Sequence, residues 1–293
     1  MKACYHSKVI LFGEYSMIFD ATALMIPLKR FAARWKLSEA NTAAARRSNA
    51  NIARYRDYLC ADEQLRALID TEAMRKDLNM GIHLYSTIPT GYGLGSSGAL
   101  VAAVYDRYAK HPIDDNMALK ELFGQMESYF HGSSSGIDPL QCYLGQPFRI
   151  SAAGVEPIDD AFLKGDIHIC LIDTKIKSDT RPLVQQFKAQ REDSQFLHAF
   201  QQEYVPHVAT CIRHLTESNG DAFFASLKQL GQAQMRFLRA MITDNTLPLF
   251  QQDRDFHFGV KISGSGGGGY LLGFTDDVEK ATELLRDFEL IWI

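Results

Sequence analysis

The chain has 293 residues and lacks several features that mark specialised classes of protein. Its five cysteines are scattered, odd in number and never spaced as a CxxC pair, which argues against a disulfide framework and against a thiolate zinc site. No apolar run approaches the roughly 20 residues that span a bilayer. The N-terminal segment holds a short apolar stretch without a small-residue cleavage site, so we expect a buried strand there and not a signal peptide. Together these absences favour a cytoplasmic protein.

A surplus of positive charge is missing as well. Lysine and arginine number 31 against 35 aspartates and glutamates, which gives a formal net charge of −4. A weakly acidic chain is a poor candidate for binding nucleic acid or an anionic membrane through bulk electrostatics, so we expect neither as a partner. Hydrophobic residues make up 46% of the chain, which is enough to bury a core.

The length suits one large domain or two smaller ones. The segment Gly154–Gly165 contains Pro157 and several acidic residues, which is typical of a joint between domains. Strand and helix patterns lie on both sides of it. We therefore expect two domains, over residues 1–158 and 159–293.

A glycine- and serine-rich segment, Pro89–Leu100, lies between a predicted strand and a predicted helix. Consecutive glycines let backbone N–H groups converge on one point, and the helix N-terminus adds unpaired N–H donors with a partial positive charge. The segment therefore predicts a phosphate-binding loop, although no lysine precedes its serines as in a GxxxxGK[ST] loop. The alternative is a glycine turn that only caps a helix. The residues expected to bind phosphate are Pro89, Gly91, Gly93, Leu94, Gly95, Ser96, Ser97 and Gly98.

A second small-residue loop, Gly132–Gly136, is followed closely by Asp138. Nothing bulky crowds a carboxylate in that position, so it can approach a substrate hydroxyl and orient or deprotonate it for attack on phosphorus. The alternative is an Asp-Pro turn, in which Asp138 only caps the backbone.

Two charged residues elsewhere could take part in the same chemistry. Glu127 lies 11 residues before Asp138 on a predicted helix, near its buried side. One carboxylate, one hydroxyl and substrate phosphates would supply the oxygen ligands that Mg²⁺ prefers. Lys8 lies just before the first predicted strand, where an ammonium group can steady a phosphoryl group in transfer. Taken singly, each of the two is more simply interpreted as a solvated charge.

A late glycine motif, Lys261–Tyr270, contains four successive glycines between two predicted strands. Glycine in this position is entropically unfavourable and usually marks a place where another backbone or a ligand comes very close. We favour such a close approach over the alternative, a flexible hairpin.

In this order, these segments resemble the motifs of the GHMP small-molecule kinases, a superfamily named for galactokinase, homoserine kinase, mevalonate kinase and phosphomevalonate kinase. The resemblance rests on Lys8–Tyr15, on Pro89–Ala99 with its GLGSS core and on Lys261–Gly269, which together span nearly the whole chain. Two further stretches resemble mevalonate kinase in particular. His131–Asp138 is similar to its HGTPSGxD motif, and Asp173–Thr180 is similar to its NTKxPRxT motif.

The resemblance implies an α+β, two-domain GHMP kinase fold. Residues 1–158 would form an N-terminal, ribosomal-protein-S5-like α/β domain that binds ATP, and residues 159–293 would form a C-terminal ferredoxin-like α+β domain with the late glycine motif. The implied activity is ATP-dependent phosphorylation of a small hydroxylated acid, with mevalonate, converted to 5-phosphomevalonate in isoprenoid biosynthesis, as the first choice. ATP would be the co-substrate and Mg²⁺ the cofactor, and the resemblance allows a homodimer.

The resemblance also implies a role for each matching residue. Asp138 would be the catalytic carboxylate and Lys8 its cationic neighbour. Ser97 and Glu127 would hold the magnesium ion. The acceptor pocket would be lined by Glu14, Tyr15 and Thr180. The phosphate loop would be supported by Gly264, Ser265, Gly266, Gly267 and Gly268.

Some residues depart from the family pattern. Tyr15 replaces the histidine of the GEH sequence of mevalonate kinases, and Pro139 follows the catalytic aspartate where asparagine is usual. Both changes fall on the acceptor side, so a phosphomevalonate kinase or a sugar kinase stays open as an alternative. His6 and Ser7 replace the usual Pro-Gly before Lys8. The altered first motif also leaves open a relative that binds a nucleotide or metabolite without transferring a phosphoryl group.

Overall fold

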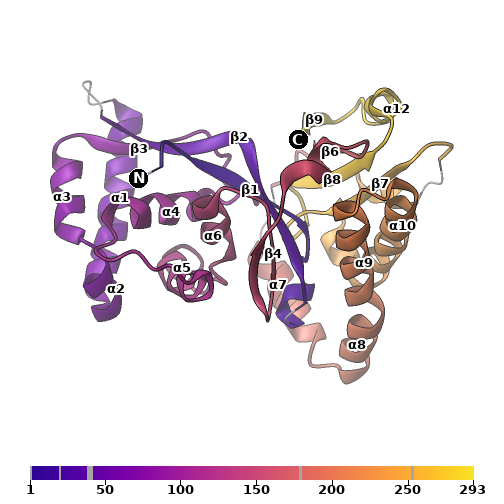
Figure 1. The fold of residues 1–293 in the computed structure, drawn as a ribbon, viewed down its shortest axis with the longest axis horizontal. Coiled ribbons are helices and arrows are strands. Elements are labelled where there is room, and N and C mark those ends of the chain that lie inside the picture. Colours follow the sequence, from indigo (N-terminus) through magenta and orange to yellow (C-terminus); the bar gives the residue numbers. More distant parts are fainter. Residues whose placement is uncertain (1, 20, 38–41, 178–179, 252–253) are drawn as a thin grey trace. The chain divides into compact units, whose positions relative to one another are not determined.

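The structure is a computed structural model that describes residues 2–19, 21–37, 42–177, 180–251 and 254–293. Its contacts divide the chain into two compact units (Figure 1). Unit 1 comprises Met1–Lys8, Pro27–Pro89 and Leu94–Gln146, and unit 2 comprises Val9–Ile26, Thr90–Gly93 and Pro147–Ile293. The two units interleave along the sequence, and the division into domains at residues 158 and 159 stays a prediction.

A five-stranded sheet contains the first strands of the chain. Its members are β1 (Tyr5–Phe12), β2 (Ala23–Leu37), β3 (Ile82–Ser86), β4 (Phe148–Ser151) and β5 (Gly154–Pro157). The strand order is β1-β2-β4-β5, and β3 pairs with β2 as well. The 15-residue length of β2 allows this, because β4 pairs with its first residues and β3 pairs antiparallel with Ala33–Leu37.

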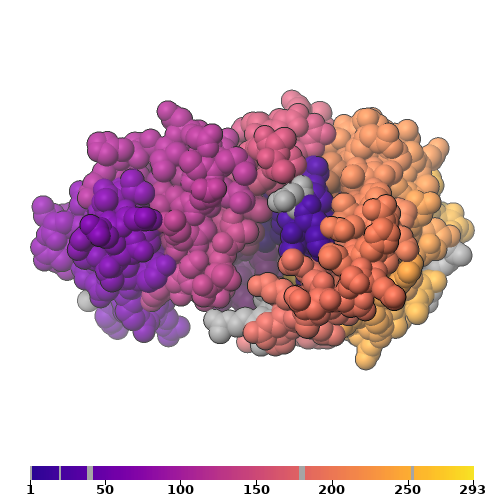
Figure 2. Space-filling view, turned by 90° about the horizontal axis from the view of Figure 1, so that it is seen from below, coloured from indigo at the N-terminus to yellow at the C-terminus, as the bar shows by residue number. Residues whose placement is uncertain are grey.

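Helices of unit 1 cover one side of β2 and β3 (Figure 1). They are α1 (Ala43–Ala61), α2 (Glu63–Leu68), α3 (Thr71–Asn79), α4 (Ser96–Tyr108), α5 (Asn116–His131) and α6 (Ile137–Leu144). The Trp35 indole N–H of β2 donates to the carbonyl of Ala103 in α4, and the Ser48 hydroxyl of α1 donates to Leu84 of β3. Figure 2 shows the purple and magenta segments of this unit packed closely on one face. The Tyr58 hydroxyl of α1 donates to the carbonyl of Gln125 in α5.

Unit 2 holds a four-stranded antiparallel sheet with the order β7-β8-β6-β9. Its strands are β6 (His168–Asp173), β7 (Phe258–Ile262), β8 (Tyr270–Thr275) and β9 (Glu289–Trp292). The helices of the unit are α7 (Thr180–Gln190), α8 (Ser194–Ala199), α9 (Val205–Thr216), α10 (Gly220–Phe237), α11 (Leu247–Gln251) and α12 (Val278–Leu284). A π-helical segment, Phe200–Tyr204, joins α8 to α9 just before Pro206, whose missing N–H removes one α-helical hydrogen bond.

Three 3₁₀ segments complete the described structure. They are Ser16–Phe19, Asp160–Lys164 and Arg239–Met241. Among the described residues, no helix has both the length and the apolar character that crossing a membrane requires.

A buried ion pair joins the two ends of the sequence inside unit 2. The Nζ of Lys261 on β7 lies 2.6 Å from Oε1 of Glu14, and it also donates to the carbonyl of Ile262 at 2.5 Å. Both side chains are almost fully buried, at 1% and 2% exposed. Burial raises the pKa of Glu14 and lowers the pKa of Lys261, while the contact between the two charges opposes both shifts. The pair therefore depends on both partners being present.

Lys261→Met should remove the cation and leave the Glu14 carboxylate buried without a partner. We expect the free energy of unfolding to fall by about 3 kcal/mol or more, because an uncompensated buried charge is strongly destabilising. Adding Glu14→Leu to Lys261→Met should recover much of this loss. The matched control is Lys164→Met, since Lys164 forms an exposed ion pair with Asp160 and should contribute little to stability. Urea denaturation measures all four proteins, and equal stability of Lys261→Met and the wild type would contradict the account.

Candidate active site

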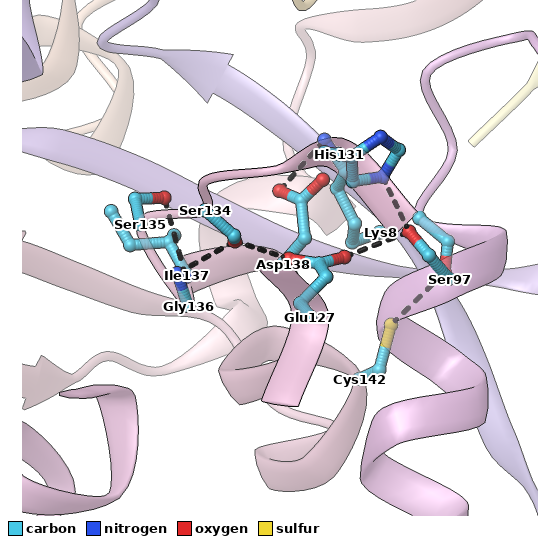
Figure 3. Close-up of polar contacts among 11 residues, drawn as sticks. Lys8, Ser97, Glu127, His131, Ser134, Ser135, Gly136, Ile137, Asp138 and Cys142 are labelled. Carbon is cyan, nitrogen blue, oxygen red and sulfur yellow. Dashed lines mark hydrogen bonds and ion pairs between the residues drawn. The ribbon is translucent and has the colours of Figure 1, made fainter. Parts of the chain in front are cut away.

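Four of the predicted site residues meet in unit 1 (Figure 3). Lys8 belongs to β1, Ser97 lies in the first turn of α4, Glu127 lies near the end of α5, and Asp138 lies in the first turn of α6. The two helix N-termini therefore carry a hydroxyl and a carboxylate, and the end of a third helix brings the second carboxylate.

The absence of side chains at three glycines allows these helices to come together. A Cβ on Gly98 of α4 would lie 2.9 Å from the backbone carbon of Asp138. A Cβ on Gly136 would lie 1.9 Å from the carbonyl oxygen of Lys120 in α5, and one on Gly124 of α5 would lie 2.9 Å from the carbonyl oxygen of Ser134. Gly136 also needs its positive φ of 72°, because in that conformation it caps the start of α6.

Lys8 and Asp138 form an ion pair. The Nζ of Lys8 lies 2.9 Å from Oδ1 of Asp138. The Lys8 side chain is only 4% exposed, whereas the Asp138 side chain is 32% exposed. Lys8 is therefore no solvated strand-end lysine, and the Asp138 carboxylate can be reached by a small molecule while it keeps a buried cationic partner.

Glu127 accepts two hydrogen bonds from serine hydroxyls. Ser97 Oγ donates to Oε1 at 2.8 Å, and Ser134 Oγ donates to Oε2 at 2.6 Å. Glu127 is 3% exposed, so the interpretation as a solvated helix residue is wrong. Burial, and then the nearby charge of Asp138, raise the pKa of Glu127 to about 7, and the two serine hydrogen bonds and Lys8 limit this rise.

The sequence motif contained two residues of the site to which we had assigned no role. One is Ser134, the hydrogen-bond donor to Glu127. The other is His131, the last residue of α5, whose Nε2 lies 3.1 Å from Ser97 Oγ. His131 follows Glu127 by four residues, a spacing that puts both side chains on one face of a helix and could have identified it.

The predicted phosphate loop divides between the two units. Leu94 to Gly98 belong to unit 1, where Gly95 caps α4 with a positive φ of 76°, and Leu94 accepts a backbone hydrogen bond from Lys8. Gly91 and Gly93 belong to unit 2 and are exposed, with open space where a Cβ would lie. Pro89 ends the preceding segment of unit 1. The first backbone N–H groups of α4 thus follow directly on a loop in which every second residue from Gly91 to Gly95 is a glycine.

The late glycine motif packs against backbone, so the interpretation as a flexible hairpin is wrong. A Cβ on Gly266 would lie 2.5 Å from the carbonyl oxygen of Met241, and one on Gly268 would lie 2.6 Å from that of Ile176. Gly269, the next residue, adjoins the phosphate loop, because its Cβ position is 3.4 Å from the carbonyl oxygen of Tyr92. Support of the loop by Gly264 to Gly268 stays a prediction.

Glu14 and Tyr15, which we expected in the acceptor pocket, bind the late glycine motif. Glu14 pairs with Lys261, and the Tyr15 hydroxyl donates to the carbonyl of Ser265 at 2.7 Å. Tyr15 has a positive φ of 59°, which is rare for a bulky residue. Thr180 begins α7, but its side chain lies outside the described part of the structure. The contacts of these residues with an acceptor stay a prediction.

The donor atoms at Ser97 and Glu127 fit a magnesium ion. They are a hydroxyl oxygen and carboxylate oxygens, held 2.8 Å apart, and Mg²⁺ prefers such oxygen ligands and commonly completes its shell with water and phosphate oxygens. Within the described ranges, no group of three or more His, Cys, Asp or Glu side chains could hold a metal ion.

Glu127→Gln should change how stability depends on pH in the absence of metal and nucleotide. A glutamate whose pKa rises from 4.5 to about 7 on folding contributes stability that is complete at low pH and is lost as the pH rises through about 7. The wild type should therefore lose stability across this window, and Glu127→Gln, which stays neutral, should not. Glu121→Gln, on the exposed side of the same helix, controls for the removed charge. Parallel curves for wild type and Glu127→Gln in thermal denaturation would contradict the assignment.

Comparison with known families and structures identifies the architecture. Residues 62–146 match the sequence model of the family described as GHMP kinases N terminal domain. The fold is similar over 99% of the chain to Methanococcus jannaschii mevalonate kinase, with a TM-score of 0.63, 18% identity and 96% of that chain covered.

Two other solved structures are similar to the same extent, each over 99% of this chain. Streptococcus pneumoniae phosphomevalonate kinase, in complex with phosphomevalonate and AMPPNP, has a TM-score of 0.65, 16% identity and 99% of its chain covered. Lactococcus lactis galactokinase, complexed with galactose, has a TM-score of 0.66, 13% identity and 91% of its chain covered. The fold class expected from the sequence is confirmed: over 99% of its length the chain has the fold of these kinases, and residues 62–146 match the GHMP kinase N-terminal domain model.

Proposed function

We propose that this protein is a small-molecule kinase that transfers the γ-phosphoryl group of ATP to a hydroxyl group with the help of magnesium. The observation that carries the proposal is the ion pair of Lys8 and Asp138 at 2.9 Å, beside the Ser97–Glu127 pair at the start of α4. Phosphoryl transfer needs positioning and charge stabilisation more than covalent chemistry, and this group of residues supplies both.

The triphosphate of ATP would bind at the phosphate loop, Pro89–Gly98. The backbone N–H groups that open α4 are unpaired within the helix and carry a partial positive charge, so they favour a phosphate. The exposed glycines Gly91 and Gly93 leave room for it. The terminal phosphates would then lie next to Ser97, at the second residue of the helix.

Ser97 and Glu127 would hold Mg²⁺, which when bound supplies positive charge to the β- and γ-phosphates. Glu127 is suited to this because its two oxygens already lie in a fixed position between Ser97 and Ser134. Its raised pKa means that the buried carboxylate lacks a full counter-charge, and a nearby cation would favour the ionised form.

Asp138 would accept the proton of the acceptor hydroxyl. As that oxygen bonds to the γ-phosphorus, the bond from the γ-phosphorus to the bridging oxygen breaks and ADP leaves. Lys8 would hold the Asp138 carboxylate in place before the transfer and stabilise negative charge on the acceptor oxygen during it. The partial exposure of Asp138 beside a buried Lys8 supports this division of roles.

We favour mevalonate as the acceptor, which would make the protein a cytoplasmic enzyme of isoprenoid biosynthesis. The support is the resemblance of His131–Asp138 and Asp173–Thr180 to two mevalonate kinase motifs. Phosphomevalonate and sugars are the alternatives, because proteins with those acceptors have similar folds. Tyr15 supports these alternatives, because it occupies the position where mevalonate kinases have histidine. Its hydroxyl donates to the carbonyl of Ser265.

Asp138→Asn should lower turnover by roughly 100- to 10,000-fold, because asparagine cannot accept the proton. ATP binding should survive, because Asp138 belongs to α6 and is not part of the loop, Pro89–Gly98, that would hold the phosphates. ADP release measures turnover, with mevalonate, phosphomevalonate, homoserine and sugars tested in turn, and Asp114→Asn in the exposed α4–α5 connection is the control.

The same assay separates the proposal from its alternatives. Turnover with one acceptor class identifies the substrate. Full activity of Asp138→Asn would rule out Asp138 as the base. ATP binding without turnover on any acceptor would contradict the kinase proposal and favour a relative that only binds nucleotide.

A further inference from the structure

We infer that His131 is a positioning residue for the metal site: it fixes the Ser97 hydroxyl so that this oxygen can bind the magnesium ion of a bound nucleotide. The inference rests on the proposed function and adds to it a residue outside the predicted set. Its basis is the contact of 3.1 Å between His131 Nε2 and Ser97 Oγ (Figure 3).

The hydrogen-bonding capacity of Ser97 defines what His131 does. A serine hydroxyl has one proton to donate and two lone pairs that accept. The proton goes to Oε1 of Glu127 at 2.8 Å, so His131 Nε2 donates its own proton to one lone pair of Ser97 Oγ. One lone pair remains for a cation, and two hydrogen bonds fix the direction in which it points.

The loss of either partner would free the Ser97 side chain. A serine in the first turn of a helix has several rotamers and can bond to nearby backbone groups instead. With Glu127 as its only partner, the hydroxyl would keep one hydrogen bond but would lose its second anchor. His131 and Glu127, one helical turn apart on α5, therefore hold Ser97 of α4 as a pair.

His131 itself is suited to an outer position around the metal. Mg²⁺ prefers oxygen ligands, so an imidazole nitrogen is a poor direct ligand but a good partner for an oxygen that does bind the ion. His131 is exposed, at the end of α5, and the core does not depend on it. A histidine in the last turn also interacts favourably with the helix dipole, which is the simpler role that an experiment must exclude.

The experiment measures binding of Mn²⁺, a spectroscopic substitute for Mg²⁺, to the protein with ADP present. Electron paramagnetic resonance gives the concentration of free Mn²⁺, so neither an acceptor nor turnover is needed. The variants are His131→Ala, His131→Gln, Ser97→Ala and the double variant. Gln125→Ala, another exposed residue of α5, is the matched control.

His131→Ala should weaken Mn²⁺ binding about 10-fold, as the loss of an outer partner of a metal ligand typically does. Affinity for ADP without metal should stay unchanged, which a role in general helix stability does not predict. His131→Gln should recover most of the loss, because its amide N–H can reach the same oxygen. His131→Ala should have no further effect in the Ser97→Ala background.

Several results would overturn the inference. They are wild-type Mn²⁺ affinity in His131→Ala, an undiminished effect of His131→Ala when Ser97 is absent, or equal affinity of Ser97→Ala and the wild type. Failure of the proposed function looks different, because it is the absence of ADP release with every acceptor. Thermal denaturation of each variant shows whether it is folded. If His131→Ala does not fold, the comparison of His131→Gln with the wild type and Ser97→Ala still tests the inference.

Discussion

A methyl group on Gly98 would have to occupy space 2.9 Å from the backbone of Asp138. The same holds for Gly124 and Gly136, whose missing side chains let α5 approach the loop and helix that carry Ser134 and Asp138. At each of the three glycines the atom nearest to an added Cβ belongs to the backbone, so a rotamer change could not make room for a side chain. Because the helices come this close, the side chains of Ser97 on α4, Glu127 on α5 and Asp138 on α6 lie near one another.

Charge then sets what the assembled group can do. Two carboxylates lie near one another beside a single buried lysine, Lys8, and burial and the charge of Asp138 raise the pKa of the deeper one, Glu127, to about 7. Asp138 keeps the direct contact with Lys8. The group therefore lacks positive charge as it stands. A magnesium ion with a nucleotide would supply it, which is why this geometry suits phosphoryl transfer better than proton transfer alone.

The sequence predicted the parts of this account that depend on local pattern. The loop glycines, the helix that follows them and the aspartate after the second small-residue loop are all encoded within a few residues. Lys8, Ser97, Glu127 and Asp138 meet as the family pattern implied, and their roles stay predictions. The GHMP kinase fold was predicted on the order of three motifs and is confirmed.

The remaining features depend on long-range contacts that no local pattern encodes. Glu14 and Lys261 are 247 residues apart, so neither position indicates that they form a buried ion pair. The same limit applies to Tyr15, whose hydroxyl binds the carbonyl of Ser265. His131 could have been found from its helical spacing, but only the fold shows that Ser97 lies opposite it. Only the structure could decide whether Lys8 and Glu127 are solvated charges or site residues. Both are buried, which the sequence alone does not indicate.

The most direct measurement is a crystal structure of the protein with ADP, Mg²⁺ and aluminium fluoride, which imitates the phosphoryl group in transfer. The account predicts that the fluoride group lies next to Asp138 and Lys8, with the metal ion bound by Ser97 and Glu127. A nucleotide bound at another place, with Asp138 remote from the fluoride and no metal ion at Ser97, would contradict it.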